Sequence, residues 1–165
     1  MRQPEVFISW SGDHSQAIGQ AFKTWIPAIL QGVEAFFTPA DVDKGAHGEN
    51  EIAMHLEAAQ VGVFCFTRES LNSHWMVYEA GALSKKLDEA QVCSLLCGIE
   101  RLQLPAPLRG LQTTEWEKDD IRKLIGTLNS ALVGDKRSPV PEESLSELFE
   151  VMWPRLDAKV APLLE

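Results

Sequence analysis

Glu79 is the residue of this chain with the clearest potential for chemistry. It lies within residues 75–83 (WMVYEAGAL), where most of its neighbours are apolar. Trp75 is four positions earlier, so on a helix both side chains project from one face. Because an ionised carboxylate is costly to bury without a partner, an acid on this face indicates either a stabilising contact or a functional role. A carboxylate held away from water can stabilise positive charge that develops in a reaction.

A structural role for Glu79 is the alternative interpretation. Its carboxylate would then lie at the rim of the core and bind a loop backbone, or pair with Arg68 or Lys44. Spacing along the chain is compatible with both roles.

Other chemical motifs are weak or missing. Cys93 and Cys97 lack a second pair of zinc ligands, and no metal site is predicted. No glycine-rich dinucleotide or phosphate-binding motif follows the first predicted strand, and Ser11-Gly12 does not form a nucleophile elbow. The histidines also lack metal-ligand spacing: His14, His47, His55 and His74.

The composition indicates one globular domain that does not bind nucleic acid. The chain has 165 residues, 45% of them hydrophobic, and a formal net charge of -9. An acidic surface disfavours contact with phosphate backbones. The three cysteines are typical of free thiols in a reducing compartment. A strand that begins near residue 5 leaves no room for a signal peptide, and no apolar run is as long as a membrane span. We therefore expect a cytoplasmic protein.

Apolar strands alternate with amphipathic helices along the chain. This order predicts a doubly wound α/β sandwich with a mostly parallel sheet. In the first helix, Asp13 or Ser15 is expected to cap the start, and Pro27 is expected to cause a kink or break. We predict strands at 5–10, 35–38, 61–67, 92–97 and within 111–116, a polar loop at 39–48, and helices starting near 13, at 49–59, from Asn72 or Ser73 to 86, and at 119–132.

The last part of the chain is predicted to be separate from this pattern. Residues 1–135 form the predicted domain, and 136–165 form a linker followed by one more helix. An apolar stripe favours docking of that helix on the domain over binding to a partner module; the stripe consists of Leu145, Leu148, Phe149, Met152 and Leu156.

Ligands of open parallel sheets bind beyond the carboxyl ends of the strands. Four segments are expected to reach that edge: residues 9–12, 39–48 and 67–69, and the helix start that carries Trp75 and Glu79.

Three stretches that overlap these segments resemble Toll/interleukin receptor (TIR) domains of bacteria. Residues 6–11 (VFISWS) resemble the opening strand of that family, and residues 37–45 (FTPADVDKG) resemble its second strand and BB loop. Residues 67–83 (TRESLNSHWMVYEAGAL) resemble its third helix, with a Trp-x-x-x-Glu pair, and are the most specific motif. The likeness extends over roughly residues 5–132 and is strongest to TIR domains of antiviral defence systems.

The resemblance implies a flavodoxin-like fold, so we expect a three-layer sandwich with a mostly parallel five-stranded sheet. The extra C-terminal helix predicted above lies outside the resemblance. It also implies an NAD glycohydrolase in which Glu79 is the catalytic glutamate, NAD is the substrate and no cofactor or metal is needed. The products would be nicotinamide and either ADP-ribose or a cyclic isomer of it. Residues that would border the NAD site are Ser9, Trp10, Ser11, Phe37, Asp41, Lys44 and Trp75.

The resemblance further implies activation by self-association through the BB loop, residues 39–48. A sensor module or partner could act through the C-terminal helix, and neither a nucleic acid nor a membrane is an expected partner. A non-catalytic signalling adaptor that works by TIR–TIR assembly is the main alternative. A deoxyribosyltransferase, which also uses a glutamate, is another. A phospho-acceptor receiver is disfavoured because Thr67, not Asp, follows the third strand.

Overall fold

A computed structural model describes residues 3–39, 46–87, 91–134 and 137–164. Strands and helices alternate through most of the chain, as the hydrophobic pattern predicts. In order they are β1 (Glu5–Trp10), α1 (Asp13–Ile29), β2 (Glu34–Pro39), α2 (Ala46–Ala58), β3 (Val61–Phe66), η1 (Arg68–Ser70), α3 (His74–Lys86), β4 (Val92–Leu96), η3 (Arg101–Gln103), η4 (Ala106–Leu108), β5 (Gln112–Glu115), α4 (Lys118–Ala131), α5 (Glu142–Val160) and η5 (Ala161–Leu163).

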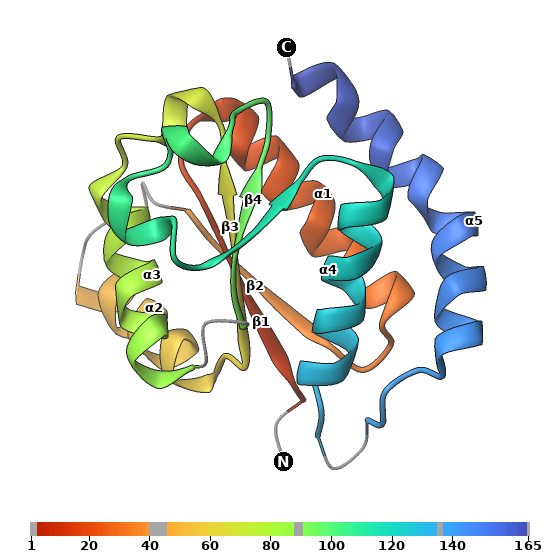
Figure 1. Cartoon of the computed structure of the whole chain (residues 1–165). Helices are drawn as coiled ribbons and strands as arrows, with labels where there is room; N and C mark the ends of the chain where they lie inside the picture. Colours follow the sequence, from red (N-terminus) through yellow and green to blue (C-terminus); the bar gives the residue numbers. More distant parts are fainter. Residues whose placement is uncertain (1–2, 40–45, 88–90, 135–136, 165) are drawn as a thin grey trace.

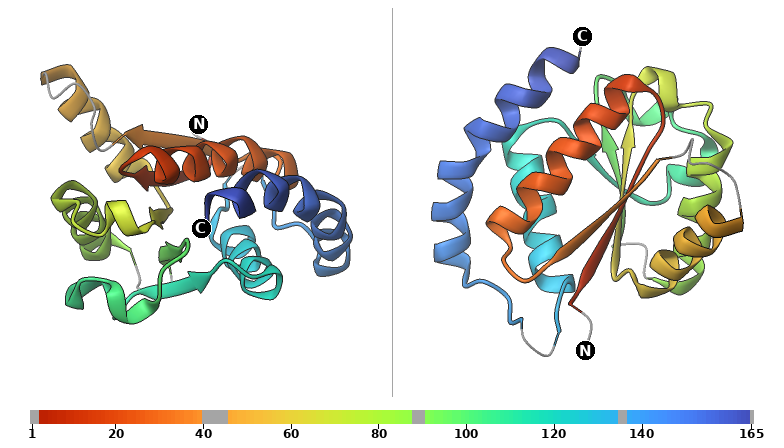
Figure 2. Two further views of the ribbon diagram at one scale, coloured as in Figure 1. Left: turned by 90° about the horizontal axis from the view of Figure 1, so that it is seen from above. Right: turned by 180° about the vertical axis from the view of Figure 1, so that it is seen from behind.

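The sheet has five parallel strands in the order β2-β1-β3-β4-β5. Helices α2 and α3 cover one face, and α1, α4 and α5 lie on the other (Figures 1 and 2). This arrangement confirms the predicted α/β three-layer fold with a C-terminal helix. β1 lies between β2, which is an edge strand, and β3, which is the central strand. After β1 the chain adds β2 on one side, and it then adds β3 on the other side of β1. Open parallel sheets usually bind ligands where the strand order reverses in this way.

Two hydrophobic cores, one on each face, hold the helices to the sheet. β1 and β3 are buried along their whole length, as expected for strands covered on both sides. Alternate side chains of β1 enter different cores: Val6 and Ile8 contact the core under α1, α4 and α5, whereas Phe7 contacts the core under α2 and α3. The alternation fixes which residues of a strand can meet α3.

The start of α1 is stabilised differently from the prediction. Its N-cap is Gly12, and no side-chain cap bond is formed by Asp13 or Ser15. Instead, Oε1 of Glu69 accepts a hydrogen bond from the backbone N–H of His14 at 2.7 Å. Gly12 has a φ of 91°, and a Cβ there would lie 2.6 Å from Cδ of Glu69. Glycine is therefore required for this close approach.

Two other boundaries differ from the prediction. α1 runs unbroken through Pro27 to Ile29, because core packing of the flanking residues outweighs the loss of one backbone hydrogen bond near the helix end. α2 begins at Ala46, three residues before the predicted start at Glu49. By contrast, Ser73 is the N-cap of α3, as predicted, and its Oγ accepts from the N–H of Met76 at 3.2 Å.

Helix α5 docks on the domain, as the apolar stripe predicts. Trp25 Nε1 of α1 donates to the backbone oxygen of Met152 at 2.9 Å, and Trp116 Nε1 donates to Asp157 Oδ1 at 2.9 Å. Leu148 is an exception to the predicted stripe, because it is 39% exposed, and Trp153 is buried instead.

The segment before α5 is more tightly held than a linker. Arg137 is buried and donates hydrogen bonds to the backbone oxygens of Gln31, Asn129 and Leu132, and also to Oδ1 of Asn129. Two of these oxygens lie at the C-terminal end of α4, where backbone carbonyls lack helical partners. Arg137 therefore connects the end of α4 to the turn before β2.

The three cysteines are free and buried. Burial raises the pKa of Cys65 and of Cys93 to about 12. Burial also raises the pKa of Cys97, and the negative charge of a Cys65 thiolate raises the pKa of Cys97 by a further, smaller amount. These thiols are protonated and unreactive in the folded state at neutral pH.

Alkaline pH is expected to destabilise the protein through these thiols. Above about pH 9 the unfolded chain loses thiol protons that the folded chain keeps. The contribution to stability is therefore complete below that pH and is lost as the pH rises towards 12, by about 1.4 kcal/mol per pH unit for each thiol. Urea unfolding from pH 8 to pH 10.5 measures the slope. Cys65→Ala should remove the contribution of one thiol to this slope. An unchanged slope in that variant would show that the buried Cys65 thiol does not cause the loss of stability.

Among the described residues, no helix is both long enough and apolar enough to cross a bilayer.

Candidate active site

The candidate site lies where β1 ends, on the face of the sheet covered by α3. Ser9 is the next-to-last residue of β1 and pairs in register with Phe64 of β3. Glu79 projects from the middle of α3 towards it. β1 and β3 are the neighbouring strands at the reversal of strand order, so the two side chains lie at the expected ligand crevice.

Ser9 and Glu79 are joined by a short hydrogen bond. Ser9 Oγ donates to Glu79 Oε1 at 2.5 Å, and both residues are fully buried. This distance is in the range of charge-assisted O–H···O⁻ bonds. The bond holds the carboxylate in one orientation and joins α3 to β1. It satisfies the requirement that a buried acid has a partner.

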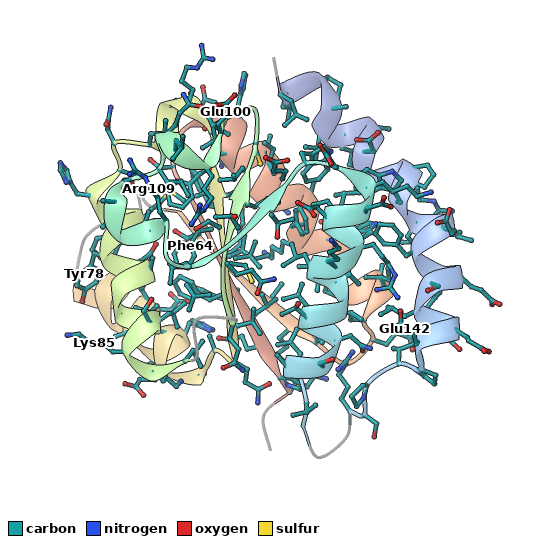
Figure 3. The ribbon with its side chains drawn as sticks, in the orientation of Figure 1. Phe64, Tyr78, Lys85, Glu100, Arg109 and Glu142 are labelled. Atoms are coloured by element: carbon teal, nitrogen blue, oxygen red, sulfur yellow. The ribbon has the colours of Figure 1, made fainter. Side chains whose placement is uncertain are left out.

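The amphipathic pattern of α3 explains why Glu79 points inward. Met76, Ala80 and Leu83 are buried on the same side of the helix, and they anchor it over β1 and β3. Tyr78, which is 60% exposed, and Lys85 project from the other side (Figure 3). Glu79 is therefore held in the core by the three apolar residues around it.

Trp75 lies one helical turn before Glu79 and is partly buried against the same core. Its ring stacks on Tyr78 with centroids 5.3 Å apart. Its indole Nε1 is buried and has no hydrogen-bond partner among the described residues. An unmet donor of this kind can bind a ligand acceptor.

Trp10 and Phe37 form a separate aromatic pair. Their ring centroids are 5.3 Å apart, and Phe37 packs on the core under α1. A Cβ on Gly19 of α1 would lie 2.7 Å from Cε1 of Phe37. Successive strand residues point to opposite faces, so Trp10 points away from the side where Ser9 meets Glu79. The structure does not bring this pair together with the carboxylate.

Ser11, another predicted site residue, lies at the turn between β1 and α1. Its backbone N–H donates to Ser15 Oγ at 3.1 Å. Ser15 Oγ in turn donates to the backbone oxygen of Cys65 at 2.6 Å. Asp41 and Lys44 lie outside the described residues, as does most of the predicted BB loop.

Ser15 and Glu69 form contacts near the end of β1 that were not predicted from the sequence. Ser15 was considered only as a helix cap, yet it links the turn after β1 to the end of β3. Glu69 was placed at the edge without a role, yet it binds the start of α1. The bonds from Ser15 to Cys65 and from His14 to Glu69 span 50 and 55 positions, and the bond from Ser11 to Ser15 crosses a turn. Local spacing in the sequence carries no signal for such contacts.

The described part of the chain contains no group of three or more His, Cys, Asp or Glu side chains that could hold a metal ion.

Comparison with models of known protein families and with curated proteins finds no match for this chain.

Proposed function

We propose that this protein cleaves the bond between nicotinamide and ribose in NAD, with Glu79 as the catalytic carboxylate. The observation that carries the proposal is the fully buried carboxylate of Glu79, held by Ser9 near the carboxyl end of β1, where the strand order of the flavodoxin-like sheet reverses. The resemblance of residues 6–11, 37–45 and 67–83 to TIR domains supports the same conclusion.

The chemistry requires a negative group beside the ribose. Nicotinamide leaves as a neutral molecule, so its departure needs little help from an acid. Positive charge develops on the ribose as an oxocarbenium-like ion. A preorganised carboxylate stabilises that charge most strongly where water is excluded. Glu79 has this character, because Ser9 fixes its orientation and the core of α3 excludes solvent.

Trp75 is suited to binding the substrate beside Glu79. The ring can stack on nicotinamide or adenine, and the buried Nε1 can donate to a ligand oxygen. Attack by water would give ADP-ribose, and attack by an adenine nitrogen would give a cyclic product. As in the family that the chain resembles, we propose that assembly through residues 39–48 activates the protein, in a role in bacterial antiphage defence.

A non-catalytic TIR-type adaptor is the second candidate function. The hydrogen bond between Ser9 and Glu79 favours it too, since a bond between α3 and β1 also stabilises a scaffold. An adaptor would leave NAD intact at any protein concentration, which separates the two functions.

Incubation of the protein with NAD, followed by chromatography, tests the proposal. Samples with and without a crowding agent allow for activation by assembly, and parallel samples with deoxynucleosides test the deoxyribosyltransferase alternative. We expect release of nicotinamide that increases with crowding, together with an ADP-ribose or cyclic ADP-ribose peak. Intact NAD under crowding would favour the adaptor, and cleavage of deoxynucleosides alone would favour the transferase.

Ser9→Ala is expected to lower kcat for NAD cleavage by about 10- to 100-fold with little change in KM, because a hydrogen bond to a charged group contributes about 1.5 to 3 kcal/mol. Ser9→Thr keeps the hydroxyl and should restore most of the rate.

Ser94→Ala is the matched control. Ser94 is a buried strand residue that pairs with Phe64, as Ser9 does from the other side, and its hydroxyl has no partner among the described residues. Equal kcat values for the two alanine variants, at equal melting temperatures, would show that Ser9 does not position Glu79.

A further inference from the structure

Two neighbouring cavities lie at the carboxyl ends of β3, β4 and β5. Their volumes are about 300 Å³ and 580 Å³. Arg68, Gly98 and Leu164 line both cavities. Ser9, Trp75 and Glu79 are not among the described residues that line them. The larger volume is within the usual range of small-molecule sites. We call the two cavities together the Arg68 crevice.

The C-terminal segment forms one wall of the Arg68 crevice. α5 brings the chain to the same end of the molecule as the carboxyl ends of the strands (Figure 1). There the turn after β4 contacts Leu164: Gly98 has a φ of 75°, and a Cβ at that position would lie 2.6 Å from the Leu164 backbone oxygen. Glycine is thus required both by the conformation and by the contact.

The charges that line the larger cavity are of both signs. Arg68 is exposed and has no hydrogen bond or ion pair with a described residue. The carboxylates of Glu115 and Glu117 line the same cavity, are exposed, and form no ion pair within the described part of the chain. Glu100, labelled in Figure 3, is a third acid in the lining.

Apolar side chains complete the lining. Leu96, Ile99 and Trp116 face the larger cavity together with Leu164. Trp116 is held in place, because its Nε1 donates to Asp157 of α5. The crevice therefore combines one guanidinium, several carboxylates and a preformed apolar wall.

We propose that the Arg68 crevice is a second ligand site, which binds a small zwitterion of the amino-acid type. The ligand carboxylate pairs with the guanidinium of Arg68, whose fork of donors matches a carboxylate. The ligand ammonium faces Glu115 and Glu117, and an apolar side chain packs near Ile99 and Trp116. A multiply charged anion such as phosphate is disfavoured, because the surrounding carboxylates repel it.

Amide spectra of the ¹⁵N-labelled protein test this site independently of any reaction with NAD. The probes are L-leucine, N-acetyl-L-leucine and L-leucinamide, of which the second lacks the ammonium and the third lacks the carboxylate. We expect saturable shifts of the Gly98 amide and the Trp116 indole with leucine, and at least about tenfold weaker binding of each blocked analogue.

Charge-removing variants assign the two ends of the ligand. Arg68→Gln should weaken leucine binding and abolish the preference for leucine over leucinamide. The double variant Glu115→Gln, Glu117→Gln should abolish the preference for leucine over N-acetyl-leucine. Arg155→Gln is the control, because Arg155 is exposed on α5 and lines a different cavity. This variant should bind leucine as the unaltered protein does.

Three results would overturn the proposal. The first is an absence of shifts at Gly98 and Trp116 with leucine near its solubility limit. The second is equal binding of all three probes. The third is tighter binding of inorganic phosphate than of leucine at these same resonances.

Discussion

The Glu79→Gln protein is expected to fold normally and to release nicotinamide from NAD at least about 100-fold more slowly, because one preorganised electrostatic group contributes about 3 kcal/mol. Glutamine has the size of glutamate, and its amide oxygen can still accept the hydrogen bond from Ser9. Only the negative charge beside the ribose is lost. Initial rates at saturating NAD, together with the melting temperature of each protein, measure the effect.

Glu69→Gln is the matched control for this substitution. Glu69 lies at the same end of the sheet, but it is exposed and binds the N–H of His14. An amide oxygen can replace that acceptor, so this variant should keep a rate within about threefold of the unaltered protein. A folded Glu79→Gln protein that retains a similar rate would remove Glu79 from the catalytic role.

Arg137→Ala is expected to have the largest effect on stability. The substitution leaves backbone oxygens of Gln31, Asn129 and Leu132 without their donor in a buried position. Loss of such a hydrogen-bonded charge costs about 3 kcal/mol, which lowers the melting temperature by about 6 to 12 °C for a chain of this size. Thermal unfolding followed by circular dichroism measures the difference.

Arg155→Ala provides the comparison, since this arginine is exposed on α5. Its expected change is within about 0.5 kcal/mol. If both variants unfold at the same temperature, the hydrogen bonds of Arg137 do not stabilise the end of α4.

The sheet and helices follow from local patterns in the sequence. β1 and β3 are short apolar runs, and the periodicity of α3 identifies both its buried side and its Ser73 cap. These features depend on residues close in the chain, so spacing is enough to predict them. The position of Glu79 on a mostly apolar helix face is also a local feature, so it could be predicted from the sequence. The burial of Glu79 agrees with a position on that face.

Contacts between distant segments were not predictable in the same way. The bond between Ser9 and Glu79 spans 70 positions, and its existence depends on how α3 crosses β1. The sequence pattern placed Arg137 in a linker, but its side chain is buried and donates four hydrogen bonds. A solvated loop and a buried cap have the same local composition, so only the packed structure distinguishes them.

The two phenylalanines of β2 illustrate another limit. Phe36 faces Phe7 and stacks on His55 with centroids 3.5 Å apart, whereas Phe37 faces Trp10 and α1. Adjacent strand residues always point to opposite faces, but a pair of identical residues does not indicate which one lies on the face covered by α3. The register of β2 against β1 determines that.

The structure of Glu79→Gln bound to NAD provides the most direct test, because a slow variant retains the intact substrate. We expect the anomeric carbon of the nicotinamide ribose to lie within about 4 Å of the residue 79 side chain, next to Ser9. NAD bound away from that side chain, for example in the Arg68 crevice, would contradict it.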